Sequence, residues 1–174
     1  GTADASELAR RIQALLAYSS STDSDGIIFT GSFFGDAVAQ ARSAIGIPVL
    51  RSFDGVLDEA LREDRPLYVL STAVDSVVLL QEEFRQEVQR RALSTTISGH
   101  VVEGALTAVV SGEAARHDEL VLNAVESVDP EATIVFAQFS MERVLSPAIE
   151  LRRQSVVGPA TSAVRLLRRK IERL

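Results

Sequence analysis

An internal repeat constrains the fold of this 174-residue chain more than any other feature. When the sequence is shifted by 107 positions, IIFTGSFFG at 27–35 aligns with IVFAQFSME at 134–142. Without a gap, the apolar pair at 49–50 then aligns with the pair at 156–157, and a helical pattern follows each pair. Strands and helices recur in any α/β protein, but a gapless match over about 40 positions favours a duplicated strand–turn–helix–strand–helix segment.

Short apolar runs alternate with longer helical patterns along the whole chain. Strands are expected at 27–30, 48–50, 67–71, 95–102, 134–137 and 156–157. Helices are expected at 6–17, 36–45, 53–62, 75–92, 113–128, 141–152 and 161–174, and Pro147 is expected to kink or split the sixth of these. Uniformly apolar strands that alternate with helices predict an α/β fold with parallel sheets covered on both faces.

The repeat predicts two pseudo-symmetric, Rossmann-like lobes. The N-terminal lobe is placed at 1–66 and the second lobe at 67–174, with the final helix expected to pack back on the first lobe. Two strands precede the second copy of the repeat, whereas none precedes the first. We therefore expect the first lobe to lack its N-terminal strands, with about 40 residues absent from the sequence, and a natively shortened lobe is the alternative.

Composition excludes several classes of function. The chain has 18 basic and 24 acidic residues, and its net charge of −6 argues against general nucleic-acid binding. Cysteine is absent, which excludes disulfides, thiolate zinc sites and cysteine nucleophiles. The two histidines, His100 and His117, fit no compact metal motif, so no metal is expected. No apolar run approaches the roughly 20 residues of a membrane helix, and no secretory signal is visible, so a cytoplasmic location is expected.

A turn of small and hydroxyl residues, Gly31–Ser32, separates the strand at 27–30 from the next helical pattern. Junctions of this kind hold anions in α/β proteins. Hydroxyl side chains recur at the equivalent strand ends and helix starts: Thr30, Ser32, Ser71, Thr72, Ser140, Thr161 and Ser162. Helix capping or turn formation explains each of them singly. As a set, they predict a cradle for a carboxylate.

The pattern DGIIFTGSFFG, followed by IPVL and a helix, resembles the Asp/Glu/hydantoin racemase superfamily. The later AQFSM, followed by Pro159 and a helix, is similar to a subgroup of that family, and the resemblance extends from Glu7 to Leu174. It implies two pseudo-symmetric lobes with the active site in the cleft between them, no cofactor, and a homodimer. Family members place one cysteine at the end of each central strand. One thiol removes a proton from the carbon beside a carboxylate, and the other returns it.

The resemblance places the two family cysteines at Gly31 and Gln138, and neither residue can accept a proton. The subgroup has glutamine at the second place, so Gly31 is the chief departure, and the sequence leaves open whether this glycine is native or introduced. The resemblance implies substrate-binding roles for the neighbouring residues Thr30, Ser32, Phe33, Ser71, Thr72, Phe139, Ser140, Pro159 and Thr161.

The leading interpretation is an amino-acid racemase or isomerase-type protein that acts on or binds a small carboxylate, such as an amino acid, and is inactive as written. The alternatives are a non-catalytic carboxylate-binding protein and a single-thiol decarboxylase or lyase of the same fold. Other ionisable groups are interpreted as solvated or structural: Asp75, His100, Glu103, a surface pair at 117–118, and the basic residues of the last helix.

Overall fold

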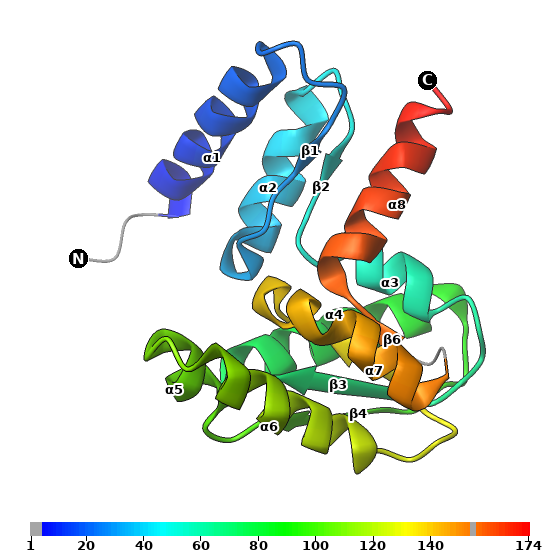
Figure 1. The fold of residues 1–174 in the computed structure, drawn as a ribbon. Coiled ribbons are helices and arrows are strands. Elements are labelled where there is room, and N and C mark those ends of the chain that lie inside the picture. The colour runs from blue at the N-terminus through cyan, green and yellow to red at the C-terminus, as the bar shows by residue number, and fades with distance from the viewer. Residues whose placement is uncertain (1–4, 154–155) are drawn as a thin grey trace. The chain divides into compact units, whose positions relative to one another are not determined.

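The computed structural model describes residues 5–153 and 156–174, which belong to two units (Figure 1). Unit 1 contains residues up to 55 together with 163–174, and unit 2 contains residues 56–162. Helices α3 (Asp54–Ala60) and α8 (Pro159–Ile171) each continue from one unit into the other. The lobe boundary that the sequence places between residues 66 and 67 therefore stays a prediction.

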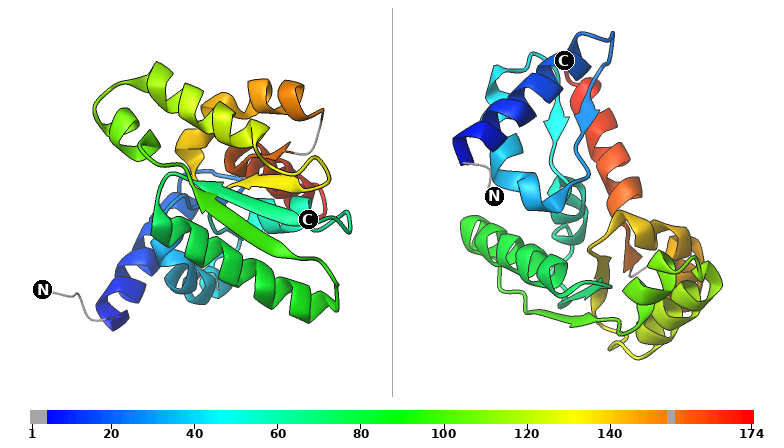
Figure 2. Two further views of the ribbon diagram at one scale, coloured as in Figure 1. Left: turned by 90° about the horizontal axis from the view of Figure 1, so that it is seen from below. Right: turned by 90° about the vertical axis from the view of Figure 1, so that its left-hand side faces the viewer.

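Unit 2 is built on a four-stranded parallel sheet with the strand order β4–β3–β5–β6. Its strands are β3 (Leu67–Ser71), β4 (Ile97–Val101), β5 (Thr133–Phe136) and β6 (Val156–Val157). Its helices are α4 (Val74–Arg91), α5 (Ala105–Val110), α6 (Ala114–Glu126), the 3₁₀ helix η3 (Phe139–Val144) and α7 (Leu145–Arg152). Figure 2 shows α4 on one face of this sheet and α5, α6 and α7 on the other, which explains why β5 is buried along its length.

Unit 1 contains two parallel strands, β1 (Ile27–Ile28) and β2 (Val49–Leu50). Its other elements are α1 (Ala5–Ser20), the 3₁₀ helices η1 (Ser32–Phe34) and η2 (Arg42–Ala44), α2 (Gly35–Ala41), and the adjoining parts of α3 and α8. In Figure 1, α1 and α2 lie on one side of the strands and α8 lies on the other. The apolar stripe of α1 is buried against α2 and β2 through Ile12 and Leu16, as its helical spacing predicts.

The strand pairing confirms the internal repeat. Ile27 pairs with Val49 in unit 1, and the residues 107 positions later, Ile134 and Val156, pair in unit 2. Core positions match at the same spacing: Phe29 with Phe136, Val38 with Leu145, Ala41 with Ala148, and Val49 with Val156. Helices α1 and α6 also correspond, since each precedes the first strand of its copy.

Two local expectations differ from the structure. The residues predicted to form one kinked helix at 141–152 form η3 and then α7, with the break between Val144 and Leu145. Pro147 lies in the first turn of α7, where its missing N–H leaves no helical hydrogen bond unmade. Helix α5, which is one short apolar segment, was not predicted. Across the described residues, no helix has the length and apolar character needed to span a membrane.

Candidate functional site

The carboxyl ends of β3 and β5 bring three predicted site residues of unit 2 into contact. These strands are parallel neighbours, so Gln138 follows β5 at the level where Ser71 ends β3. The Gln138 side-chain oxygen accepts three hydrogen bonds: from the Ser71 hydroxyl at 3.0 Å, the Thr72 hydroxyl at 2.6 Å and the Thr72 N–H at 2.7 Å. Ser71 and Thr72 are buried, so these bonds hold the glutamine amide in one orientation.

This network determines what Gln138 offers to a ligand. A backbone N–H can only donate, so the atom that faces Thr72 is the amide oxygen, and the amide nitrogen lies on the other side. Among the described residues, that nitrogen has no hydrogen-bond partner, and it is not enclosed. Gln138 therefore presents N–H donors at the strand end and has no group that titrates near neutral pH.

Ser71 and Thr72 donate hydrogen bonds to Gln138, so their hydroxyl protons are not available to a ligand. The Ser71 hydroxyl also accepts a hydrogen bond of 3.1 Å from the Ala73 N–H at the start of α4. Both hydroxyls are therefore engaged within the protein. The following residues Phe139 and Ser140 begin η3, and the Ser140 side chain is exposed.

A carboxylate from within the chain occupies the N-terminus of α8. Glu142 accepts hydrogen bonds of 2.9 Å from the Ala160 N–H and the Thr161 N–H, and it is also bonded to the Thr161 hydroxyl. Gly158 makes this approach possible, since a Cβ at that position would lie 2.5 Å from a Glu142 oxygen. Helix N-termini attract anions through their unpaired N–H groups. The donors of Thr161, and the helix start at Pro159, are thus used by Glu142 in this structure.

In unit 1, the turn after β1 is packed against aromatic rings, whereas the strand end at Gln138 in unit 2 is held by hydrogen bonds. Gly31 has an extended backbone, with φ −86° and ψ 100°. A Cβ at this position would lie 2.8 Å from the Phe34 ring and 3.0 Å from the Phe29 ring, and these two rings form an edge-to-face pair. The space in which a side chain at position 31 would begin is therefore filled by aromatic rings.

The turn in unit 1 nevertheless has exposed polar and apolar groups. Thr30 is exposed, and the hydroxyls of Thr30 and Ser32 have no hydrogen-bond partner among the described residues. Phe33 is 67% exposed. Ser52, which the sequence did not single out, donates a 3.0 Å hydrogen bond to the Phe29 carbonyl and fixes the strand end to the start of α3.

One interpretation of an ionisable pair was wrong. His117 is completely buried, not on the surface, and its Nδ1 lies 2.9 Å from Asp118, which in turn pairs with Arg143 at 2.8 Å. His117 occupies a core position of α6, in line with Val121 and Val125, and this helical spacing was the signal for its burial. Asp75, His100 and Glu103 are exposed.

No protein-family model matches the chain, and no curated protein matches it in sequence. Solved structures do match. Glutamate racemase from Campylobacter jejuni aligns at a TM-score of 0.63 and 10% identity, over 97% of this chain and 69% of that chain. Allantoin racemase from Klebsiella pneumoniae aligns at a TM-score of 0.63 and 14% identity, over 97% of this chain and 69% of that chain. Unliganded arylmalonate decarboxylase aligns at a TM-score of 0.64 and 13% identity, over 98% of this chain and 78% of that chain. The chain therefore has the fold of these two racemases and of arylmalonate decarboxylase.

Proposed function

We propose that this chain is a racemase-superfamily protein that binds a small carboxylate-bearing molecule, such as an amino acid, without transferring a proton to or from it. The ligand carboxylate is bound at the strand end of unit 2 by the amide nitrogen of Gln138, with Ser140 beside it. The turn Thr30–Phe33 in unit 1 stays a separate set of predicted ligand contacts. Two of the matching structures are racemases and one is a decarboxylase, which supports a carboxylate ligand by analogy.

The fixed orientation of Gln138 carries this proposal. A base that removes a proton from carbon must have a pKa that can approach the working pH. An amide has no such pKa, and the Ser71 and Thr72 bonds restrict Gln138 to donating. A fixed N–H donor suits an oxyanion, because the donor needs no reorganisation when the ligand binds.

The surroundings of Gly31 support the absence of proton transfer. Glycine supplies no side chain, and the Phe29 and Phe34 rings occupy the place where one would start. The nearby hydroxyls of Thr30 and Ser32 are weak acids that need an adjacent base to react. Among the described residues, no hydrogen bond joins either hydroxyl to a histidine or carboxylate.

Glu142 provides an internal precedent for carboxylate binding in unit 2. Its carboxylate is held by two backbone N–H groups and one hydroxyl at the start of α8. Thr161 and Pro159 therefore stay predicted ligand contacts, and a ligand would need to displace Glu142 to reach them. The Gln138 donor is free of this competition.

The substitution Gln138→Glu tests the proposal. Glutamate keeps an oxygen for Ser71 and Thr72 but replaces the N–H donors with a charged oxygen, so it should repel a carboxylate while the fold is retained. We expect glutamate and aspartate to perturb the backbone amide signals of residues 138–140 saturably in a ¹H–¹⁵N NMR titration. Gln138→Glu should abolish this effect, and Gln89→Glu, which adds the same charge on the exposed surface of α4, should leave it intact. Equal binding by both variants would exclude Gln138 as the carboxylate donor.

The family resemblance also predicts a homodimer in the cytoplasm. Light scattering across a range of protein concentrations tests the assembly. A particle with twice the mass of the chain is expected, and a constant mass of 18.8 kDa would exclude the dimer.

A further inference from the structure

Strand β1 has an open edge at the place where its counterpart in the repeat has a partner strand. In unit 2, β5 lies between β3 and β6, so both of its edges are paired. In unit 1, β1 corresponds to β5 and β2 to β6, and no described strand takes the place of β3 (Figure 1). The arrangement in unit 2 therefore indicates what the open edge of β1 fits, which is a parallel strand.

Alternate backbone groups around β1 face this open edge. Ile27 and Phe29 donate hydrogen bonds of 2.8 and 2.9 Å to carbonyls of β2 and the residue before it. Because the backbone groups of successive strand residues point to opposite edges, those of Gly26, Ile28 and Thr30 face away from β2. None of these three N–H groups has a hydrogen-bond partner among the described residues.

The equivalent N–H groups of unit 2 are bonded to β3. Thr133 and Ala137 lie 107 positions after Gly26 and Thr30, and they donate hydrogen bonds of 2.8 and 2.9 Å to carbonyls of β3 and the residue before it. All four residues of β5 are buried, whereas both residues of β1 are only partly buried. A parallel strand beside β1 would satisfy its open N–H groups and bury its apolar side chains.

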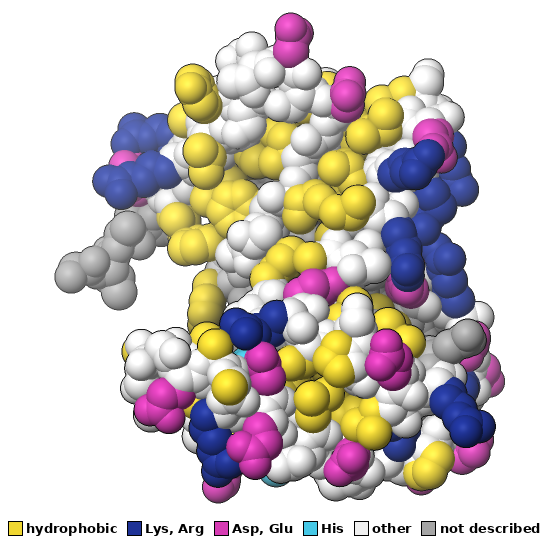
Figure 3. Space-filling model, in the orientation of Figure 1, with side chains coloured by type: hydrophobic (Ala, Val, Ile, Leu, Met, Phe, Trp, Pro, Cys, Tyr) yellow, Lys and Arg dark blue, Asp and Glu magenta, His cyan; other side chains and the backbone are white. Residues whose placement is uncertain are grey.

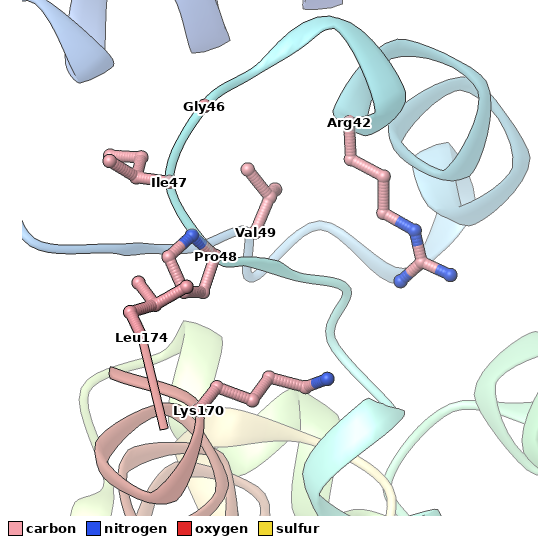
Figure 4. A pocket seen from close by; sticks show the side chains of 7 residues that line it. All are labelled: Arg42, Gly46, Ile47, Pro48, Val49, Lys170 and Leu174. Carbon is pink, nitrogen blue, oxygen red and sulfur yellow. The ribbon is translucent and has the colours of Figure 1, made fainter. Parts of the chain in front are cut away.

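The segment that leads into β2 is different, because charged side chains lie beside it. Residues 46–49 border a cavity of about 420 Å³, and Figure 4 shows the charged ends of Arg42 and Lys170 on the same side of this segment. Charged side chains at a strand hinder its pairing with further strands. The segment 26–30 contains no charged residue, so β1 has no such protection in its own sequence.

The face of unit 1 seen in Figure 1 is apolar at its centre. Figure 3 shows apolar side chains gathered there, with acidic and basic side chains at the margins. Unit 1 exposes large apolar side chains at Leu15, Tyr18, Phe33 and Phe34. An apolar, uncharged partner suits this surface.

We propose that the open edge of β1 binds an extended apolar segment of another polypeptide, which adds as a parallel strand in the register that β3 has on β5. In that register, the bound segment places residues opposite Ile27 and Phe29, as Tyr68 and Leu70 lie opposite the counterparts of these residues in β5. Backbone hydrogen bonds supply the affinity of such strand addition, and the alternating side chains supply its specificity.

A synthetic peptide with the sequence of residues 64–73, DRPLYVLSTA, tests the proposal on the unmodified protein. We expect it to perturb the amide signals of Gly26, Ile28 and Thr30 saturably when it is titrated into ¹⁵N-labelled protein. Hydrogen exchange of these three amides should become slower on binding. The amides of Ile27 and Phe29 are already bonded, so their exchange should change less.

Two N-methylated peptides separate strand pairing from general apolar attachment. In β3, Leu70 faces β5, because its carbonyl accepts the Ala137 N–H, whereas the neighbouring Val69 faces β4. N-methylation of Leu70 in the peptide removes a donor directed at β1 and should weaken binding by at least about fivefold. N-methylation of Val69 removes a donor directed away from β1 and should change the affinity by less than about twofold.

Three results would overturn the proposal. Equal weakening by the two methylated peptides would show attachment without strand pairing. No saturable binding, or perturbation confined to residues 133–137, would show that the peptide does not add to β1. Signals of residues 26–30 that shift with protein concentration and not with the peptide would show that a second copy of the chain occupies the edge.

Discussion

The two copies of the repeat share a scaffold but differ at the residues that follow their strands. Strand pairing keeps the same spacing in both copies, and the core positions of β1, α2 and β2 in unit 1 correspond to those of β5, α7 and β6 in unit 2. At the strand ends, Gly31 in one copy corresponds to Gln138 in the other. Two aromatic rings crowd the Cβ position of Gly31, whereas hydrogen bonds fix the Gln138 side chain. Core packing thus specifies the strands and helices that the two copies share, whereas the residues that follow the strands differ between the copies.

The starts of the following helices differ in the same manner. Asp54 begins α3 and accepts the Arg51 N–H at 2.9 Å, so this helix supplies its own anion. The equivalent position in α8 is Thr161, and the anion there is Glu142, which belongs to η3. One helix start is thus closed by a local contact, and the other by a residue 19 positions away.

The largest difference is expected in the two cores. Phe136 is completely buried, and its substitution by alanine should cost about 3–5 kcal/mol of unfolding free energy. Its counterpart Phe29 is only partly buried, so Phe29→Ala should cost no more than about 2 kcal/mol. Urea denaturation followed by circular dichroism measures both values. Equal losses would show that the two copies are packed equally well.

The next effect concerns the glycine of unit 1. Gly31→Cys should destabilise the protein by about 1–3 kcal/mol, because the Phe34 and Phe29 rings must move to admit the side chain. In a Phe34→Ala background, the same change should cost much less. Gly46→Ala is the control and should be neutral or slightly stabilising, because no atom lies near its Cβ position. Thermal unfolding separates these cases, and a fully stable Gly31→Cys protein would contradict the ring contact.

The helix start of unit 2 gives a smaller effect. Glu142→Ala should lower the unfolding free energy by about 1–2 kcal/mol, because two N–H groups and a hydroxyl lose their acceptor. Glu150→Ala, at an exposed position of α7, should change it by less than about 0.5 kcal/mol. Chemical denaturation of both variants is sufficient, and similar values would mean that Glu142 does not stabilise α8.

The smallest effect is a pH dependence in α4, which has no counterpart among the described elements of unit 1. A hydrogen bond from Arg90, together with Arg91, lowers the pKa of Glu87 to about 2, although burial opposes this shift. A lowered folded pKa gives stability that is complete above the unfolded value of 4.5 and is lost as the pH falls toward 2. The pair is partly exposed, so Glu87→Gln should cost only about a few tenths of a kcal/mol at pH 7, and this cost should be mostly lost at pH 2.

The scaffold could be predicted from the sequence because hydrophobic periodicity records it. The strand at 67–71 and the register of the repeat were predicted to the residue, since apolar side chains must face the core at fixed spacing. The sequence could not predict that Ser71 and Thr72 donate to Gln138 and that Gln138 is the residue left to contact a ligand. Ser71 and Thr72 look like ligand contacts in sequence, and only the pairing of β3 with β5 shows that they hold Gln138.

Glu142 was missed for a related reason. An acidic residue in a short helix is ordinarily solvated, and nothing in its sequence neighbourhood connects it with a helix that begins at Pro159. The pair at 117–118 is predicted to lie on the surface, although the spacing of His117 from Val121 and Val125 indicates the buried face of the helix. The contact of Glu142 with α8 is not encoded in the local sequence, whereas the burial of His117 is encoded in its helical spacing.

One NMR experiment in heavy water tests most directly whether this fold binds a carboxylate without moving a proton. The protein is mixed with a panel of amino acids and 2-substituted malonates, and saturation transfer and the intensity of the α-proton signal are followed in the same samples. We expect saturation transfer to at least one carboxylate while its α-proton signal keeps its intensity, because neither Gly31 nor Gln138 can act as a base. Loss of the α-proton signal, with deuterium incorporated at that carbon, would contradict this and reveal a functional base in the chain.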